Sequence, residues 1–213
     1  MKKTKSTPIT KTSTEPVTVL VLRTCASDMT SYNGFKWPES GSIEAPDWNP
    51  KAECGNGLHG FLWGEGNGEL ANWDSDAKWL VCRVPADSVV DLHGKVKFPR
   101  CEVIHCGDRA SATAFIAANG AAGCAIVGGT STSGDRGTST SGDRGTSTSG
   151  VGGTSTSGCG GVIAITYWNG KRYKVRIGSV KDEDGEGELL PNTPYQLNER
   201  GEFVAVKKQE ATA

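Results

Sequence analysis

Residues 129–158 read GTSTSGDRGTSTSGDRGTSTSGVGGTSTSG, one octapeptide written almost four times. Every copy keeps Gly at its first and sixth positions and Thr at its second and fourth. This much Gly, together with β-branched Thr, excludes a helix. The alternatives are a disordered Ser/Gly linker and a stack of short strands. Because a linker needs no strict register, the repeat favours the stacked strands.

Period-two alternation separates the Thr and Ser side chains of each octad. Thr130 and Thr132 would face one way, and Ser131 and Ser133 the other. Small inward Ser would let two sheets approach closely, and Gly corners would allow tight bends. The repeats therefore predict a β-solenoid with an outer Thr surface. That surface comprises Thr130, Thr132, Thr138, Thr140, Thr146, Thr148, Thr154 and Thr156.

The neighbours of the repeats predict how the stack begins and ends. In the next octad, 161–168, Ile163 and Ile165 replace the inward Ser, as expected of a closing rung. Upstream, residues 121–128 (AAGCAIVG) fit the same phase loosely and are a candidate first rung. The Asp-Arg pairs at 135–136 and 143–144 would form salt bridges at the corners.

Outside the repeats, short apolar runs and turn residues predict most of the elements. Strands are expected at 18–24, 78–85, 88–92 and 102–106, a helix within 107–120, and hairpins around 169–170 and in 195–206. Asn169-Gly170 favours a type I′ turn. Residues 32–72, rich in Gly, Pro and Trp, are expected to form irregular loops held by aromatic side chains.

The predicted fold class is an α+β N-terminal domain followed by a short octapeptide β-solenoid and a β-hairpin C-terminal cap. The boundaries are a disordered leader at 1–16, the α+β domain at 17–120, the repeats at 121–165, the hairpin cap at 166–207 and a disordered tail at 208–213.

Charge and composition limit the classes of partner that the chain could bind. A net charge of −1 provides no field for nucleic acid, and the apolar run at 17–22 is too short to span a bilayer. No secretory signal is recognisable at the N-terminus, and seven Cys form an odd set, so reduced thiols in the cytoplasm of a bacterial host cell are expected. The partner would be a protein, a small molecule or a second copy bound through the solenoid or cap.

His and Cys residues supply the candidate chemistry, because His acts near neutral pH and Cys can be a nucleophile. The catalytic candidates are His59, His105, Cys54 and Asp108. Soft metal-ligand types occur at Cys54, His59, Cys101, His105 and Cys106, but neither spacing is a zinc signature. Purely structural Cys and His are the main alternative, and no metal or cofactor is expected. Whether the chain is an enzyme stays open, with the balance against it.

A glycine pattern at 55–60 matches GxGxxG by spelling alone. No predicted strand precedes it and no helix-forming run follows, so it lacks the helix N-terminus that a dinucleotide site uses.

The order of parts resembles a family of uncharacterised phage and bacterial proteins. The resemblance covers roughly residues 18–206 and depends on CGNGLHG (54–60), GKVKFPRCEVIHCGDRA (94–110), the repeats and YWNGKRYKVRIG (167–178). It implies an N-terminal domain of unknown function, octapeptide repeats and a hairpin cap. No activity is implied by the family.

The octads also resemble those of bacterial ice-nucleation proteins, which carry Thr-x-Thr in Gly-bounded repeats. Two octads per coil would give about two coils here, or about 10 Å of stacked face. The leading hypothesis is an intracellular binding or scaffold protein of phage or bacterial origin. The alternatives are an enzyme of unknown reaction in the N-terminal domain and a water-ordering, ice-binding-like Thr surface.

Overall fold

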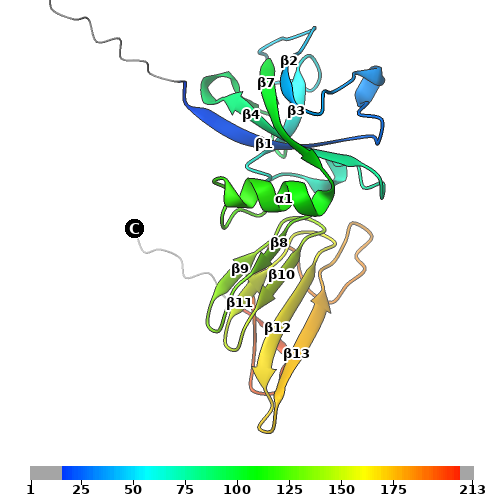
Figure 1. Ribbon diagram of the computed structural model, residues 1–213. Coiled ribbons are helices and arrows are strands. Elements are labelled where there is room, and N and C mark those ends of the chain that lie inside the picture. The colour runs from blue at the N-terminus through cyan, green and yellow to red at the C-terminus, as the bar shows by residue number, and fades with distance from the viewer. Residues whose placement is uncertain (1–15, 207–213) are drawn as a thin grey trace, which may run out of the picture.

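The computed structural model describes residues 16–206 as two parts in contact (Figure 1). The first part is a sheet with α1 (Arg109–Ala118) on one face, and the second contains the repeats and the C-terminal strands. The predicted tail, and the predicted leader apart from Pro16, lie outside the described residues. No helix in residues 16–206 is long and apolar enough to cross a membrane.

The N-terminal sheet has seven strands in the order β2-β7-β4-β1-β3-β6-β5. They are β1 (Thr18–Cys25), β2 (Gly41–Glu44), β3 (Leu58–Leu62), β4 (Lys78–Pro85), β5 (Val90–Asp91), β6 (Val96–Phe98) and β7 (Arg100–Gly107). All of their pairings are antiparallel. Short 3₁₀ turns occupy Tyr32–Gly34, Gly68–Leu70 and Ala86–Ser88. The four predicted strands and the predicted helix of this part are confirmed.

Two apolar cores lie on the two faces of this sheet. Val21 and Leu80 are buried in one core, whereas Leu22 and Val81 are buried in the other, because alternate residues of a strand face opposite ways. The second core also receives Ile116 of α1. Burial on both faces explains why β1 and β4 read as almost continuous apolar runs.

The prediction of irregular loops throughout 32–72 is wrong, because this segment contains β2 and β3. The sequence of β3, LHGFL, is short and lacks both alternation and β-branched residues. The glycine at position 60 has a steric explanation, because a Cβ there would lie 2.6 Å from the carbonyl oxygen of Leu22 on the neighbouring β1. A close approach of two backbones thus explains a glycine that weakens the sequence signal for a strand.

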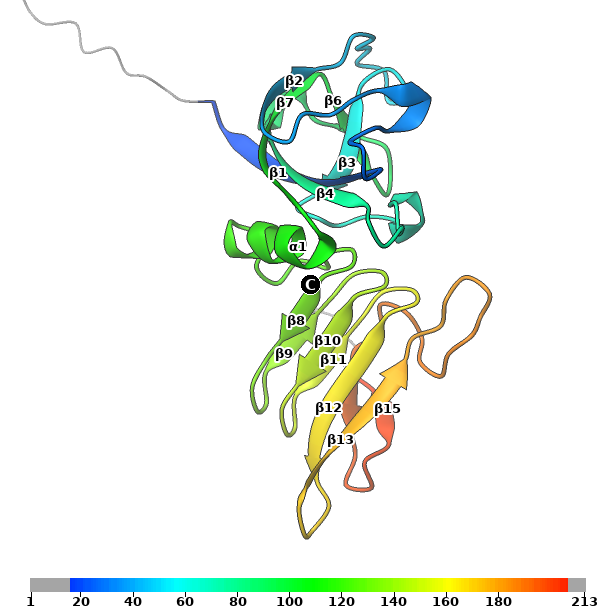
Figure 2. The ribbon, with the colours of Figure 1, turned by 45° about the vertical axis from the view of Figure 1, so that its right-hand side comes forward.

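The repeats and the C-terminal segment form two four-stranded sheets, β13-β12-β10-β8 and β15-β14-β11-β9 (Figures 1 and 2). Their strands are β8 (Thr130–Thr132), β9 (Thr138–Thr140), β10 (Thr146–Ser149), β11 (Thr154–Thr156), β12 (Val162–Trp168), β13 (Tyr173–Ser179), β14 (Tyr195–Leu197) and β15 (Phe203–Ala205). Successive octads enter the two sheets in turn. Thr146 therefore lies beside Thr130, sixteen residues earlier, in a parallel pair.

The predicted fold class is wrong. Among residues 16–206 there is one α-helix, of ten residues, and the chain is mostly β-sheet in three sheets, so an α+β N-terminal domain is not supported. The expected β-solenoid is replaced by two mixed sheets. Four octads provide each sheet with only two repeat strands. The parallel β12 and the antiparallel β13 complete the first sheet, and the antiparallel β14 and β15 complete the second.

Serine side chains fill the space between the two small sheets. Ser147, Ser155 and Ser157 have no exposed area, and Ser139 is 2% exposed. Ser139 Oγ lies 2.7 Å from Ser147 Oγ and 3.0 Å from Ser155 Oγ, and Ser155 Oγ donates to Ser149 Oγ at 2.9 Å. These buried hydroxyls are therefore paired with one another across the interior. Alternation puts Ser inside and Thr outside, as predicted.

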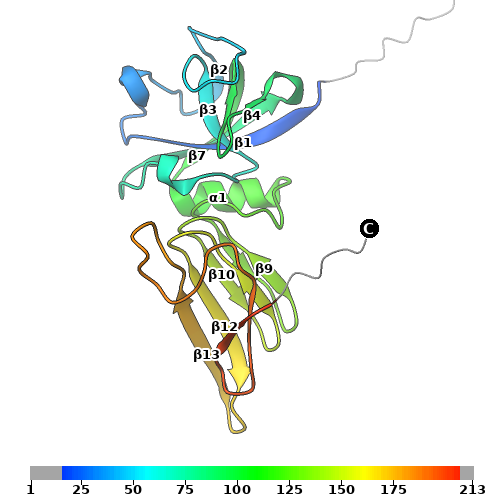
Figure 3. The ribbon, with the colours of Figure 1, turned by 180° about the vertical axis from the view of Figure 1, so that it is seen from behind.

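An apolar cluster closes the far end of the two sheets, where Figure 3 shows the C-terminal segment from behind. Ile163 and Ile165 of β12 are buried with Leu189 and Tyr195, which confirms the predicted change from inward Ser to inward Ile. Both predicted hairpins are present, as β12–β13 and β14–β15. The type I′ turn is wrong, because it needs two central residues at positive φ and only Gly170, at +89°, has one.

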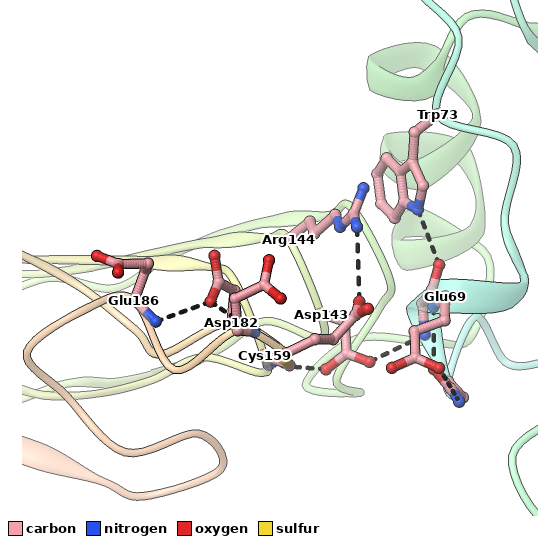
Figure 4. A network of polar contacts seen from close by, with 11 residues as sticks. Glu69, Trp73, Asp143, Arg144, Cys159, Asp182 and Glu186 are labelled. Carbon is pink, nitrogen blue, oxygen red and sulfur yellow. Dashed lines mark hydrogen bonds and ion pairs between the residues drawn. The ribbon is translucent and has the colours of Figure 1, made fainter.

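Asp143 joins the repeats to the N-terminal sheet (Figure 4). Its Oδ2 accepts a hydrogen bond from Gly68 N at 2.9 Å, and its Oδ1 accepts one from Cys159 N at 2.8 Å. Its backbone oxygen accepts from Gly128 N at 2.8 Å. At the other corner Asp135 makes the equivalent bond to Val151 N. The carboxylates thus bind backbone N–H groups sixteen residues further along, where corner salt bridges had been predicted.

Further contacts support this junction. Trp73 donates its indole N–H to Gly68 O at 2.8 Å, and the Arg144 guanidinium lies 4.9 Å from the Trp73 ring centre. The candidate first rung, 121–128, forms turns and no strand, and its Ile126 and Val127 are buried against the α1 side of the sheet. The segment that leads into the first octad is thus anchored in the apolar core of the N-terminal part.

Replacing Ser155 by Ala is expected to lower the free energy of unfolding by about 1–3 kcal/mol, because Ser139 and Ser149 each lose a buried partner. Thr138→Ala, on the exposed side of the neighbouring strand, is expected to cost about 0.5 kcal/mol or less. Urea unfolding of the two variants makes the comparison. Equal losses would show that the interior hydroxyl network contributes nothing specific.

Replacing Asp143 by Ala is expected to cost about 2–4 kcal/mol, because two backbone N–H groups lose a charged acceptor. Asp135→Ala is the matched control, since its carboxylate accepts the same kind of bond from Val151 N, sixteen residues further along, without a contact to the N-terminal part. The expected order, measured by thermal unfolding, is a larger loss for Asp143. A larger loss for Asp135 would contradict the junction described here.

Candidate functional site

The outer face of the repeats is a grid of threonines. In one sheet Thr146 lies beside Thr130 and Thr148 beside Thr132, and in the other Thr154 lies beside Thr138 and Thr156 beside Thr140. Strand geometry spaces neighbours by roughly 4.8 Å between strands and roughly 6.7 Å along a strand. Each sheet therefore presents a two-by-two array of identical hydroxyl and methyl groups.

The two arrays differ in what borders them. Next to the β8–β10 array lie the outward residues of β12, Val162 and Ala164, in register with Thr146 and Thr148. In the other sheet Gln196 of β14 donates its side-chain amide to Thr154 Oγ1 at 2.8 Å. One hydroxyl of the β9–β11 array is thus already hydrogen-bonded, so the β8–β10 array is the more open of the two.

A second candidate is a cavity of about 470 Å³ in the N-terminal part, lined by Arg23, Cys54, His59, Lys95 and others. β1 carries Arg23, β3 carries His59, and Lys95 lies just before β6. Cys54 belongs to a loop whose carbonyls at Glu53 and Gly55 accept bonds from Lys97 Nζ, at 2.8 and 3.4 Å. Lys97 itself is 1% exposed, so the loop is anchored to a buried cation.

Electrostatics sets the ionisation of the two candidate groups in this cavity. Lys95 Nζ lies 3.1 Å from Cys54 Sγ, and this contact lowers the pKa of the Cys54 thiol. Partial burial, with the charges of Lys95, Arg23 and Lys97, lowers the pKa of His59 to about 4. At neutral pH His59 is therefore uncharged, and Cys54 is the exposed cysteine closest to ionisation.

The other sequence candidates lie elsewhere. His105 Nε2 is 3.2 Å from Ser111 Oγ and its ring stacks on Phe115, while Asp108 caps α1 by accepting from Ser111 N at 2.8 Å. These contacts give both residues structural roles at the start of α1. His105 and Cys106 face opposite sides of the sheet, as predicted, since Cys106 packs with the first core.

The metal-ligand candidates are spread over the sheet. Cys101 is 5% exposed in the first core, and the Cys106 thiol lies 3.9 Å from Met29 Sδ. Within residues 16–206 no three His, Cys, Asp or Glu side chains gather in a group that could hold a metal ion. The GxGxxG match is a tight turn at 55–57 followed directly by β3, without a helix.

Sequence reasoning missed Arg23 and Lys95. The only signal for Arg23 was its charge inside the apolar run TVLVLRTC, and Lys95 lies in a turn where Lys is ordinary. Arg23 and Lys95 come close to Cys54 and His59 because β1 pairs with β3 and β3 pairs with β6. The local sequence does not predict these pairings.

Two kinds of comparison with known proteins found matches. A family model described as a domain of unknown function (DUF7666) matches residues 19–118. An ice nucleation protein of Pseudomonas syringae is 46% identical over 101 residues, 46% of this chain and 9% of that protein. Ice nucleation protein InaU of Pantoea ananas is 44% identical over 100 residues, 46% of this chain and 10% of its own length. This chain therefore spans about a tenth of these relatives.

A more distant example, from Xanthomonas campestris pv. translucens, is 43% identical over 103 residues, 47% of this chain and 7% of that protein. No solved structure matches the chain with significance. The resemblance to ice-nucleation proteins is thus supported, as is the presence of a domain of unknown function.

The pH dependence of alkylation should distinguish Cys54 from the other cysteines. The lowered pKa of Cys54 means that its reactive thiolate forms at lower pH, whereas burial raises the pKa of Cys124 and Cys159. With iodoacetamide, read by peptide mass spectrometry, Cys54 is expected to react at the lowest pH. Lys95→Gln should move its profile upward, and Lys171→Gln, an exposed hairpin substitution, should not. An unchanged profile in Lys95→Gln would contradict the assignment.

Proposed function

We propose that the β8–β10 threonine array is a water-ordering, ice-binding-like surface. The observation that carries the proposal is the register of Thr146 with Thr130 and of Thr148 with Thr132, which repeats one side chain in two dimensions. The ice nucleation proteins among the relatives support it, although this chain covers only a small share of their length.

Rigidity is the physical requirement for such a surface, because water can be ordered only by groups that hold their positions. The Ser interior supplies it from below: Ser147 is fully buried and bonds to both Ser139 Oγ and Ser139 O. Thr side chains in strands also have restricted χ1 rotamers. Hydroxyls and methyls on this face would thus keep a fixed spacing.

The size of one array limits what a single chain does. At about 10 Å across, it is a short segment of surface, and larger templates would need more copies side by side. The predicted homo-oligomer through the C-terminal cap belongs to this proposal. It is supported by the outer face of β12–β13, where Trp168, Tyr173, Val175 and Ile177 are 49–68% exposed next to the unpaired edge of the sheet.

The scaffold role, the enzyme alternative, the phage association and the cytoplasmic location remain predictions, since no comparison bears on them specifically. The threonine surface has the stronger support because both the registered array and the relatives point to it.

The test compares two matched double variants in an ice-recrystallisation assay. Thr132→Tyr with Thr148→Tyr places bulky rings on the open array, and Thr140→Tyr with Thr156→Tyr does the same on the array bordered by Gln196. The first is expected to abolish the activity of the parent chain, and the second to retain most of it. Thermal unfolding verifies that both remain folded. An inactive parent, or equal loss in both variants, would overturn the proposal.

A further inference from the structure

We propose that the cavity at Arg23 and Cys54 binds a small molecule that carries an oxyanion, either a carboxylate or a phosphate ester, and that Arg23 and Lys95 hold this group. The site lies in residues 19–118, apart from the threonine surface, and is independent of the function proposed above.

The first observation is a guanidinium without a counter-ion. Arg23 stacks on Trp37, with 4.4 Å from its central carbon to the ring centre, and its Nη1 donates to His59 O at 2.7 Å. Its Nε is covered from water and has no partner, and none of the ion pairs found in residues 16–206 includes Arg23. A partly buried guanidinium is stabilised most by an oxyanion that accepts two parallel N–H bonds.

The second observation is the charge of the lining. Among the residues that line the 470 Å³ cavity are two cations, Arg23 and Lys95, and no carboxylate. An adjoining cavity of about 440 Å³ shares Arg23, Tyr32 and His59 and includes one acidic residue, Asp47. The volume lies within the range of small-molecule sites, and cations of one sign in a concave, partly apolar pocket concentrate anions.

The third observation is a second unpaired polar atom at the same place. His59 Nε2 is covered from water and has no hydrogen-bond partner. Because its pKa is lowered to about 4, the ring is neutral at pH 7 and can donate one hydrogen bond without adding charge. A water molecule carries no charge and cannot serve as the counter-ion of Arg23, whereas an oxyanion can.

The position of Cys54 allows its alkylation to report whether the cavity is occupied. Its thiol lies 3.1 Å from Lys95 Nζ and lines the same cavity as Arg23 and His59. An oxyanion held by Lys95 would compete for the same ammonium group and cover the thiol. Occupancy can therefore be read from the alkylation rate of Cys54 as well as from binding.

The experiment is an NMR titration of the full chain, labelled with ¹⁵N, with inorganic phosphate and separately with acetate. Sodium chloride at equal ionic strength is the reference. Saturable shifts are expected for the Trp37 indole and the His59 ring, and the dissociation constant should rise about tenfold or more in Lys95→Gln, since one charged hydrogen bond is lost. Lys171→Gln, which removes a lysine far from the cavity, should leave it unchanged.

Comparing phosphate with acetate distinguishes the two classes of ligand, phosphate esters and carboxylates. Saturation by phosphate alone indicates a phosphate ester, saturation by acetate alone indicates a carboxylate, and saturation by both supports the shared oxyanion chemistry. Shifts that match those in chloride would overturn the proposal. If Lys95→Gln disturbs the fold, protection of Cys54 from iodoacetamide by phosphate in the unaltered chain, with Cys124 as the internal control, decides the question. Equal rates with and without phosphate would then overturn it.

Discussion

The hydrogen bonds among buried serines are the interaction on which the second half of the molecule depends. The two sheets can lie this close only if the side chains between them are small, and hydroxyls brought so close must bond to one another. Ser139 of one sheet contacts Ser147 of the other and Ser155 of its own sheet, so hydroxyls of both sheets are joined by hydrogen bonds across the interior. A larger inward side chain would separate the sheets, and an apolar one of equal size would leave hydroxyls unpaired.

Apolar residues border this polar interior in two places. At the far end Ile163 and Ile165 continue the inward positions with apolar bulk, covered by Leu189 and Tyr195. At the near end the apolar core under α1 and the carboxylate of Asp143 meet the first octads. The N-terminal part thereby contacts the corners of the repeats, in addition to carrying a cavity of its own.

The periodicity of the repeats made their strands easy to predict from the sequence. The strand order of the sheets was hard to predict, because it depends on pairings between distant segments. The strands at β1, β4 and β7, the helix and the inward Ser all follow from local pattern, because each has a clear alternation or propensity. The fold class did not follow, since the number of octads decides how many parallel strands each sheet contains and the C-terminal strands decide what completes it. Arg23, His59 and Lys95 meet only through strand pairing, so the candidate cavity could not be predicted from spacing.

The alternation of octads between two sheets restricts how the repeat tract can change in length. A tandem duplication of sixteen residues would add one strand to each sheet, so β12 would still join the sheet that contains β8. A change of eight residues would deliver the closing isoleucines to the opposite sheet and exchange the places of the two C-terminal hairpins. Changes in the length of this tract should therefore be tolerated in steps of sixteen residues, which is two octads.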